Sequence, residues 1–161
     1  MKKLLIMRHG EAESLNIHQR DHDRHLSTKG IEQVKSVASQ LIDLSEWHPQ
    51  KIFCSPSQRT RETYESFFEE TSFSAEISYL DQLYLGSWDT ILDKIEELED
   101  DLDCVLMIAH NPGLSDLVSN LSGEQVHLST SDLVLLKSPQ KKWLDASLTH
   151  DWSLFETLKS E

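Results

Sequence analysis

The sequence of 161 residues contains little cysteine and little glycine. Its two cysteines, Cys54 and Cys104, both lie in apolar stretches, which is typical of buried, reduced thiols in a cytoplasmic protein and not of a disulfide framework. Its five glycines form neither a glycine-rich dinucleotide motif nor a Gly-Lys-Ser/Thr phosphate loop. No Gly-x-Ser-x-Gly motif marks a nucleophilic serine. The sequence therefore predicts no nucleotide cofactor and no acyl-transfer chemistry.

Long hydrophobic runs and positive charge are also scarce. The longest apolar run, Cys104–Ala109, is too short to span a bilayer, and Arg8 ends the first apolar run before it could form the core of a signal peptide. We therefore expect no membrane insertion and a first strand at this position. The chain has 15 Lys and Arg against 28 Asp and Glu, for a formal net charge of −13, which argues against nucleic acid as a partner. An anion can be bound only where cations cluster locally.

Short apolar runs alternate with helical patterns along the chain, which predicts a parallel sheet covered by helices on both faces. The expected fold is a single α/β domain over residues 1–161, a three-layer sandwich with a mainly parallel central sheet. The predicted strands are 4–7, 52–54, 104–109 and 132–136, with at least one more within 143–155. The predicted helices are 28–45 with Thr28 as its cap, one after Pro56, one over 88–98 and one from Pro112, and the acidic run 96–103 is expected to end a helix.

Residues suited to anion binding follow three of the predicted strands. In open parallel sheets, ligands bind beyond the carboxyl ends of the strands. Two guanidinium and two imidazole groups would therefore gather at one edge of the sheet. Guanidinium forks match phosphoryl oxygens, and helix starts after Pro56 and Pro112 would offer unpaired backbone N–H groups. The three segments are Arg8-His9-Gly10-Glu11, Ser55-Pro56-Ser57-Gln58-Arg59 and His110-Asn111-Pro112-Gly113.

Together with the segment Arg24-x-Leu26-Ser27-Thr28-x-Gly30, these motifs resemble the histidine phosphatase superfamily, which includes the phosphoglycerate mutases. The resemblance is strongest to its small bacterial branch, the SixA-type phosphohistidine phosphatases. The motifs occur in the family's order and span about residues 3 to 121, and Thr63 completes the element that begins at Ser55. The resemblance implies a phosphoglycerate mutase-like fold.

The resemblance also implies a catalytic role for several residues. His9 is similar to the nucleophile of the family, which forms a covalent phosphohistidine that water hydrolyses. Arg8, Arg59 and His110 match the residues that bind the phosphoryl oxygens without a metal, and Arg24 matches a further phosphate-side arginine of the small branch. Glu11 either orients the site or is a turn residue that faces solvent.

The general acid is where the sequence departs from the mutase-like pattern. Gln82 stands where those relatives carry a glutamate, four residues before Gly86, and a glutamine cannot donate and recover a proton. Asp81 is a possible proton donor one step away, and Asp21 or Asp23 could approach from the preceding loop. An alkoxide leaving group needs strong protonation, whereas imidazole, with a pKa near 6.5, needs little. The expected substrate is therefore phosphohistidine on a protein of the histidine-phosphotransfer type, with a small phosphate ester as the alternative.

Two other functions compete with this interpretation. His18, Asp21, His22 and His25 have a spacing that would place them on one helical face as metal ligands, although the surrounding stretch has no apolar stripe. The chain could also be a phosphate-binding module without turnover. We expect no metal and no cofactor.

Overall fold

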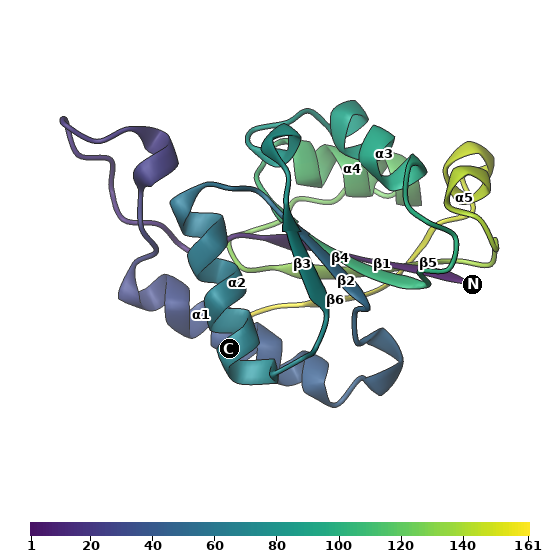
Figure 1. Cartoon of the computed structure of the whole chain (residues 1–161), viewed down its shortest axis with the longest axis horizontal. Helices are drawn as coiled ribbons and strands as arrows, with labels where there is room; N and C mark the ends of the chain where they lie inside the picture. Colours follow the sequence, from purple (N-terminus) through teal and green to yellow (C-terminus); the bar gives the residue numbers. More distant parts are fainter.

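The computed structural model describes residues 1–161 and is built around one six-stranded sheet (Figure 1). The strand order is β3-β2-β4-β1-β5-β6. The strands are β1 (Lys2–Arg8), β2 (Lys51–Cys54), β3 (Glu76–Tyr79), β4 (Cys104–Ala109), β5 (Leu133–Ser138) and β6 (Ser153–Leu158). The helices are α1 (Thr28–Ile42), α2 (Gln58–Thr71), α3 (Trp88–Glu96), α4 (Gly113–Ser122) and α5 (Trp143–Thr149), with single 3-10 turns at η1 (Asp21–Asp23), η2 (Ser45–Trp47) and η3 (Asp81–Leu83).

The first four strands of the chain run parallel to one another. β1 pairs with β4, and β2 lies between β4 and β3, all in parallel register. β5 is antiparallel to β1, and β6 is antiparallel to β5. The prediction of a mainly parallel sheet is confirmed. The carboxyl ends of β1, β2 and β4 consequently meet at the same edge of the sheet.

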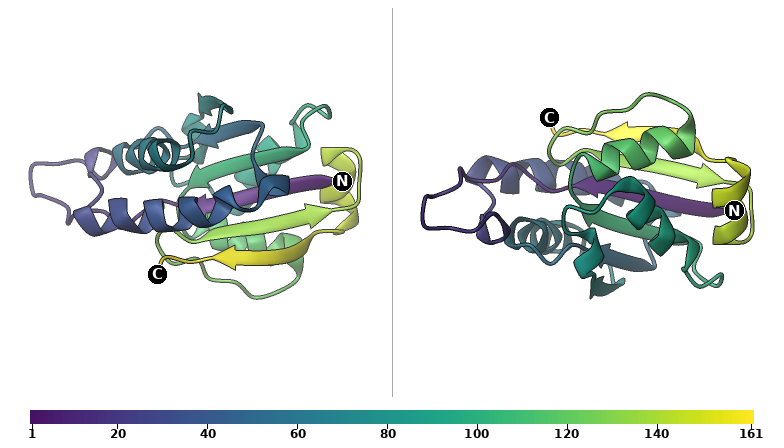
Figure 2. Two further views of the ribbon diagram at one scale, coloured as in Figure 1. Left: turned by 90° about the horizontal axis from the view of Figure 1, so that it is seen from below. Right: turned by 90° about the horizontal axis from the view of Figure 1, so that it is seen from above.

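Helices cover both faces of the sheet, as the α/β prediction requires (Figure 2). Successive residues of a strand point to opposite faces, so Leu4 and Ile6 pack with α3, α4 and α5, whereas Leu5 and Met7 pack with α1 and α2. All six residues of β4 are buried, because this strand lies between two other strands and under helices on both faces. None of the helices combines the length and the hydrophobicity that a membrane crossing requires.

Several predicted boundaries are wrong in detail. Ser27, and not Thr28, caps α1 by accepting a hydrogen bond from Gly30 N, because its backbone is still extended. α1 ends at Ile42 instead of residue 45. The acidic run begins at the end of a helix, because Glu96 is the last residue of α3, but the rest of the run lies in the connection to β4. The segment after residue 143 begins as the helix α5 and only then forms the predicted strand, β6.

Candidate active site

Two buried histidines face each other at the carboxyl edge of the central strands. His9 follows β1 and is 7% exposed, and His110 follows β4 and is 2% exposed. Their ring centroids lie 5.3 Å apart with the planes tilted by 56°. The pairing of β1 with β4 produces this contact, because Arg8 is in register with Ala109 and His9 N donates to Ala109 O at 3.3 Å.

Two glycines allow the chain to fold closely around His9. A Cβ atom on Gly10 would lie 2.7 Å from Gly30 O, and a Cβ on Gly30 would lie 2.1 Å from Glu11 O. The first turn of α1 therefore packs directly on the turn after β1. Glu11 belongs to this junction, because its carboxylate accepts a hydrogen bond of 2.9 Å from the hydroxyl of Ser27, the cap of α1.

The tautomer of His9 follows from its backbone contact. Nδ1 lies 2.7 Å from Gly10 O, and because a carbonyl only accepts, Nδ1 donates and the neutral ring keeps its lone pair on Nε2. No hydrogen bond engages Nε2. Burial lowers the pKa of His9 from 6.5 to about 4, and the nearby charges of Arg59, Arg8 and Arg24 act in the same direction, while the bond to Gly10 opposes them. His9 is therefore neutral at ordinary pH, and the lone pair of its Nε2 is free.

His110 is held as the opposite tautomer. Arg59 Nη2 lies 3.3 Å from His110 Nδ1, and because a guanidinium only donates, Nδ1 accepts. Nε2 then carries the hydrogen and donates it to Ser55 Oγ at 2.7 Å. Burial, together with the nearby His9 and Arg59, lowers the pKa of His110 from 6.5 to about 2, although the charge of Asp21 opposes this change. Ser55, which follows β2, thus fixes the ring that faces His9.

Arg59 is brought to this pair by the start of α2. Ser57 caps the helix, which places Arg59 in its first turn, where it is 2% exposed. Nη1 donates to Asp21 O at 2.8 Å, and Nη2 donates to Asp21 Oδ2 at 3.0 Å. The Nε atom is buried and has no hydrogen-bond partner. An unpartnered guanidinium N–H in a buried position is costly, so it marks a place for an acceptor.

Arg8 and Arg24 have buried, unbonded Nε atoms as well. Arg8 Nη1 donates to Leu128 O at 3.1 Å, and burial lowers the pKa of Arg8 while the charge of Asp132 opposes that effect. Arg24 Nε lies 3.2 Å from Asp21 Oδ1 but is not aligned for a hydrogen bond. The structure therefore brings together the predicted residues His9, His110, Arg8, Arg59 and Arg24.

The expected backbone donors are less free than the sequence suggests. Thr60 N of α2 donates to Ser57 Oγ at 3.4 Å, and Ser115 N of α4 donates to Asn111 Oδ1 at 3.2 Å. Leu114 N donates to His110 O at 3.0 Å. The guanidinium groups, more than the helix starts, supply the donors of this site that have no hydrogen-bond partner.

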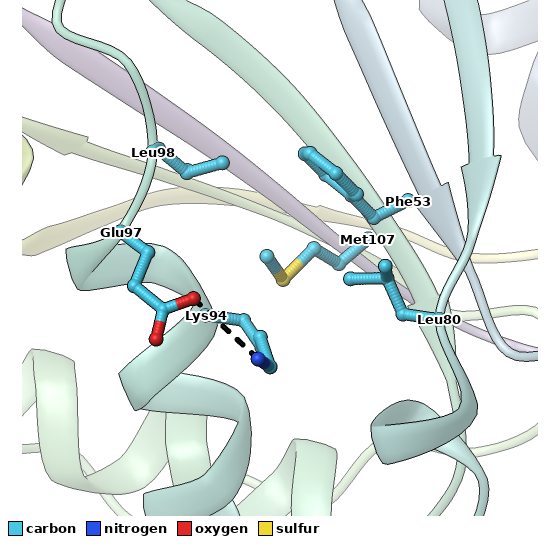
Figure 3. A pocket seen from close by; sticks show the side chains of 6 residues that line it. All are labelled: Phe53, Leu80, Lys94, Glu97, Leu98 and Met107. Atoms are coloured by element: carbon cyan, nitrogen blue, oxygen red, sulfur yellow. Dashed lines mark hydrogen bonds and ion pairs between the residues drawn. The ribbon is translucent and has the colours of Figure 1, made fainter.

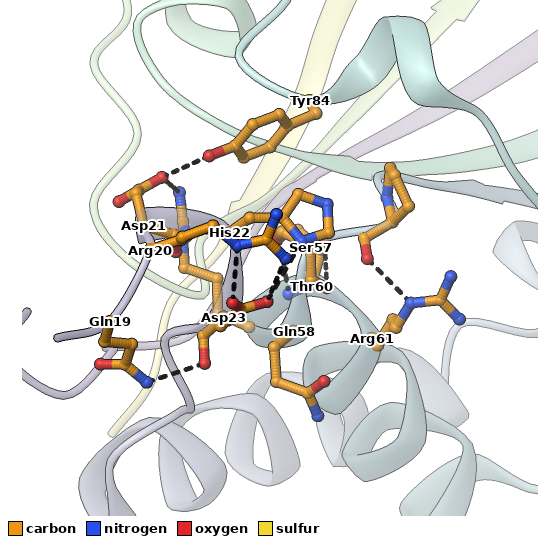
Figure 4. Close-up of polar contacts among 12 residues, drawn as sticks. Gln19, Arg20, Asp21, His22, Asp23, Ser57, Gln58, Thr60, Arg61 and Tyr84 are labelled. Atoms are coloured by element: carbon orange, nitrogen blue, oxygen red, sulfur yellow. Dashed lines mark hydrogen bonds and ion pairs between the residues drawn. The ribbon is translucent and has the colours of Figure 1, made fainter.

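Sequence reasoning did not find the contribution of Tyr84. Its hydroxyl donates to Asp21 Oδ2 at 2.7 Å, as Figure 4 shows, and its ring meets the ring of His110 edge-on at 5.5 Å. Burial opposes ionisation of Asp21, but the hydrogen bonds from Tyr84 and Arg59 and the charges of Arg59 and Arg24 lower the pKa of this carboxyl overall. The tyrosine follows the turn η3 and carries no motif that could have identified it.

The other candidate carboxylates lie outside this contact network. Asp81 is exposed, and its side chain forms no hydrogen bond or ion pair in the structure. Asp23 pairs with Arg20 at 3.0 Å on the surface. Gln82, which stands at the position of the family's glutamate, is exposed too.

The suggested metal ligands do not converge on one point. The stretch that contains them is an extended segment with the single turn η1, and not a helix. His25 Nδ1 lies 2.8 Å from Glu62 Oε2, whereas Asp21 is bound to Arg59. A metal site built on one helical face is therefore ruled out for these residues.

A hollow between the sheet and α3 lies apart from the two histidines (Figure 3). Phe53, Leu80, Leu98 and Met107 give it an apolar lining. Its only charged lining residues, Lys94 and Glu97, pair with each other at 3.4 Å. It contains none of the predicted site residues.

The family model of the histidine phosphatase superfamily (branch 1) matches residues 4–103. The chain belongs to this superfamily. Within this superfamily, the structure matches SixA-type proteins. One of them, a protein of Nakamurella multipartitia named as the phosphohistidine phosphatase SixA, is 25% identical in sequence and has a TM-score of 0.84. The match covers 99% of this chain and 96% of that chain. A SixA solved with tungstate shares the fold at 20% identity and a TM-score of 0.81, covering 98% and 96% of the two chains. An uncharacterised chloroplastic protein of Arabidopsis thaliana is 29% identical over 90% of this chain and 70% of its own length.

Proposed function

We propose that the chain is a single-domain phosphatase that removes a phosphoryl group from phosphohistidine on another protein through a covalent intermediate on His9. The observation that carries this proposal is the free Nε2 of a neutral His9 beside three arginines whose buried Nε atoms have no hydrogen-bond partner. A nucleophile next to unpaired cationic donors suits a tetrahedral oxyanion with a good leaving group. The superfamily, and the tungstate bound by a SixA neighbour, support the same class of ligand.

The proposed reaction has two steps. Nε2 of His9 forms a bond to phosphorus while the bond between phosphorus and the substrate's ring nitrogen breaks, and the leaving imidazole takes up a proton from solvent. Water then attacks phosphorus, the bond to His9 breaks, and inorganic phosphate leaves with His9 again neutral. Arg8, Arg59 and Arg24 bind the phosphoryl oxygens and stabilise their charge in the transition state. His110 orients Arg59 through Nδ1, and it binds a phosphoryl oxygen itself only where that oxygen replaces Ser55 Oγ as the acceptor of its Nε2–H.

The position of the carboxylates favours a nitrogen leaving group over an oxygen one. Asp81 has no contact with the histidine pair, and Asp21 accepts hydrogen bonds from Arg59 and Tyr84, which suits its ionised form. An alcohol has a pKa close to that of water, about 15.7, and needs a positioned acid to leave, whereas an imidazole ring, which titrates near 6.5, can take the required proton from solvent. A small phosphate ester is therefore the weaker substrate. We also propose a cytoplasmic location and a phosphoprotein partner.

The test compares a phosphohistidine peptide with an aryl phosphate, using wild type, His9→Ala and Arg59→Ala. His9→Ala should lose at least about a thousandfold in turnover and should not form a phosphoenzyme, and Arg59→Ala should lose about a hundredfold. His150→Ala, an exposed residue after α5, is the matched control and should keep full activity. Wild type should prefer the peptide, and a chelator should leave its activity unchanged.

Three results would contradict the proposal. Turnover retained in His9→Ala would exclude the covalent step. If the protein bound phosphate but no phosphoryl group could be trapped on His9, it would be a phosphate-binding module without catalysis. Loss of activity with the chelator, restored by metal, would indicate a metal-dependent hydrolase.

A further inference from the structure

We infer that Asp21 is a positioning residue that fixes the guanidinium of Arg59 and leaves its Nε–H without a partner, as a donor for a phosphoryl group. The inference depends on the proposed function only for the identity of that ligand. Asp21 belongs to η1, in the segment between β1 and α1 that extends away from the sheet (Figures 1 and 2).

The argument begins with the two edges of the guanidinium. A guanidinium is planar, with one edge formed by Nη1 and Nη2 and another by Nε and one Nη. Asp21 takes the first edge, because Nη1 donates to its backbone oxygen at 2.8 Å and Nη2 donates to Oδ2 at 3.0 Å. Nη2 also reaches His110 Nδ1 at 3.3 Å, and Nε has no partner. The Nε–H is therefore the donor that remains for an anion, and Asp21 does not occupy it.

The carboxylate is itself held from several sides. Oδ2 accepts from the Tyr84 hydroxyl at 2.7 Å as well as from Arg59, and Oδ1 lies 3.2 Å from Arg24 Nε. The Tyr84 ring rests edge-on against His110. Every hydrogen-bond partner of the carboxylate donates to it, so Asp21 serves as an acceptor and not as a proton donor. It joins the segment before α1 to α2 and to the turn η3.

An opposing effect makes the inference testable. A carboxylate near an anion site repels the anion, so simple charge removal at Asp21 should tighten phosphate binding. Loss of a hydrogen bond that orients a buried guanidinium should instead weaken phosphate binding, because Arg59 would no longer be held ready for the anion. The two interpretations predict changes of opposite sign.

The experiment measures the affinity of the full chain for inorganic phosphate by calorimetry, in wild type and in Asp21→Asn. We expect Asp21→Asn to weaken binding at least about tenfold, the range for a hydrogen bond to a charged group. Asp23→Asn is the matched control, since Asp23 lies in the same turn but pairs with Arg20 on the surface. It should change the affinity less than about twofold. Unchanged or tighter binding in Asp21→Asn would overturn the inference.

A double-mutant cycle shows whether Asp21 acts through Arg59. In an Arg59→Lys background, which keeps the charge but lacks the fork, Asp21→Asn should have less than about a threefold effect. An equal loss in both backgrounds would make Asp21 a general stabiliser of the segment and overturn the inference. If Asp21→Asn does not fold, Tyr84→Phe takes its place, because it removes one hydrogen bond to the carboxylate. It should also weaken phosphate binding, and unchanged affinity would overturn the inference.

The readout separates this inference from the proposed function. Phosphate affinity is measured without turnover, so Asp21 can be shown to position Arg59 even if phosphohistidine is not hydrolysed. Conversely, hydrolysis through His9 with no effect of Asp21→Asn on phosphate affinity would leave the proposed function intact and remove the inference.

Discussion

Lowering the pH from 7.5 to 5.5 should leave His9 almost entirely neutral. Burial, assisted by the charges of Arg59 and Arg8, lowers the pKa of His9 from 6.5 to about 4, although the hydrogen bond to Gly10 opposes this change. At pH 5.5 a histidine with a pKa of about 4 is roughly 97% neutral, whereas one with the ordinary value is only about 9% neutral. The proposed nucleophile should therefore remain competent far into the acid range.

Nuclear magnetic resonance of protein labelled with ¹⁵N-histidine measures this state directly. The His9 signals, assigned by comparison with His9→Gln, should show a neutral ring at pH 5.5 with the hydrogen on Nδ1. That tautomer is required by the 2.7 Å contact with Gly10 O. A titration midpoint near 6.5, or a hydrogen on Nε2, would refute the reasoning about burial and about the free Nε2.

The same shift predicts how stability depends on pH. Between pH 6.5 and about 4 the unfolded chain binds more protons at His9 than the folded chain does, so the free energy of unfolding decreases as pH falls. From pH 7.5 to 5.5 one such group contributes a loss of about 1.3 kcal/mol. The glutamine of His9→Gln cannot be protonated, so over the same pH range the free energy of unfolding of this variant should decrease by about 1.3 kcal/mol less than that of the wild type. Urea unfolding measures both values. Equal acid sensitivity of the two proteins would contradict the shift.

Two further predictions concern the packing around the site and the thiols. Gly30→Ala places a methyl group 2.1 Å from Glu11 O, so it should lower the free energy of unfolding by about 1–3 kcal/mol and the Tm by several degrees. Lys29→Ala, on the exposed side of the same turn, should leave the Tm unchanged, and equal Tm values for the two variants would contradict the close approach. Burial raises the pKa of both Cys54 and Cys104, that of Cys104 to about 12, so neither thiol should react with a thiol reagent at pH 8 until the protein is unfolded in urea. Rapid labelling of the native protein would contradict their burial.

The sequence predicts the centre of the sheet well, because the central strands are the most hydrophobic. β4 is an uninterrupted apolar run that is buried on both faces, and in β1 five of the seven residues are buried. Parallel strands place their carboxyl ends together, so the residues after β1 and β4 could be expected to meet before any coordinates were known. His9 and His110 are the result of that rule.

The edges of the fold are less predictable. β3 has only four residues, alternates polar with apolar side chains and has no buried residue, so no apolar run marks it. α5 has seven residues, and its buried Trp143 and Ala146 give too short a pattern to distinguish it from a strand. At these elements, packing against neighbours and not local pattern decides the conformation.

The contact between Asp21 and Arg59 was not predictable for a different reason. The two residues are 38 positions apart, and Tyr84 is 63 positions from Asp21. The segment that carries Asp21 has no apolar periodicity, so its path depends on ion pairs and hydrogen bonds to residues distant in the sequence. The sequence left Asp21 open as a metal ligand or a proton donor, and its partners in the structure make it an acceptor for Arg59 instead.

The placement of carboxylates explains how a chain with a net charge of −13 can offer an anion site. Asp21 binds the edge of Arg59 that faces away from the free Nε, and Asp132 is bound by Lys159 at 2.7 Å instead of by Arg8. The buried Arg59 and the half-buried Arg8 thus each have a negative charge nearby, which reduces the cost of burying them, while their Nε–H groups have no hydrogen-bond partner. A bound phosphoryl group would satisfy those remaining donors. The negative surface then limits non-specific anion binding, and the site depends on oriented donors more than on overall charge.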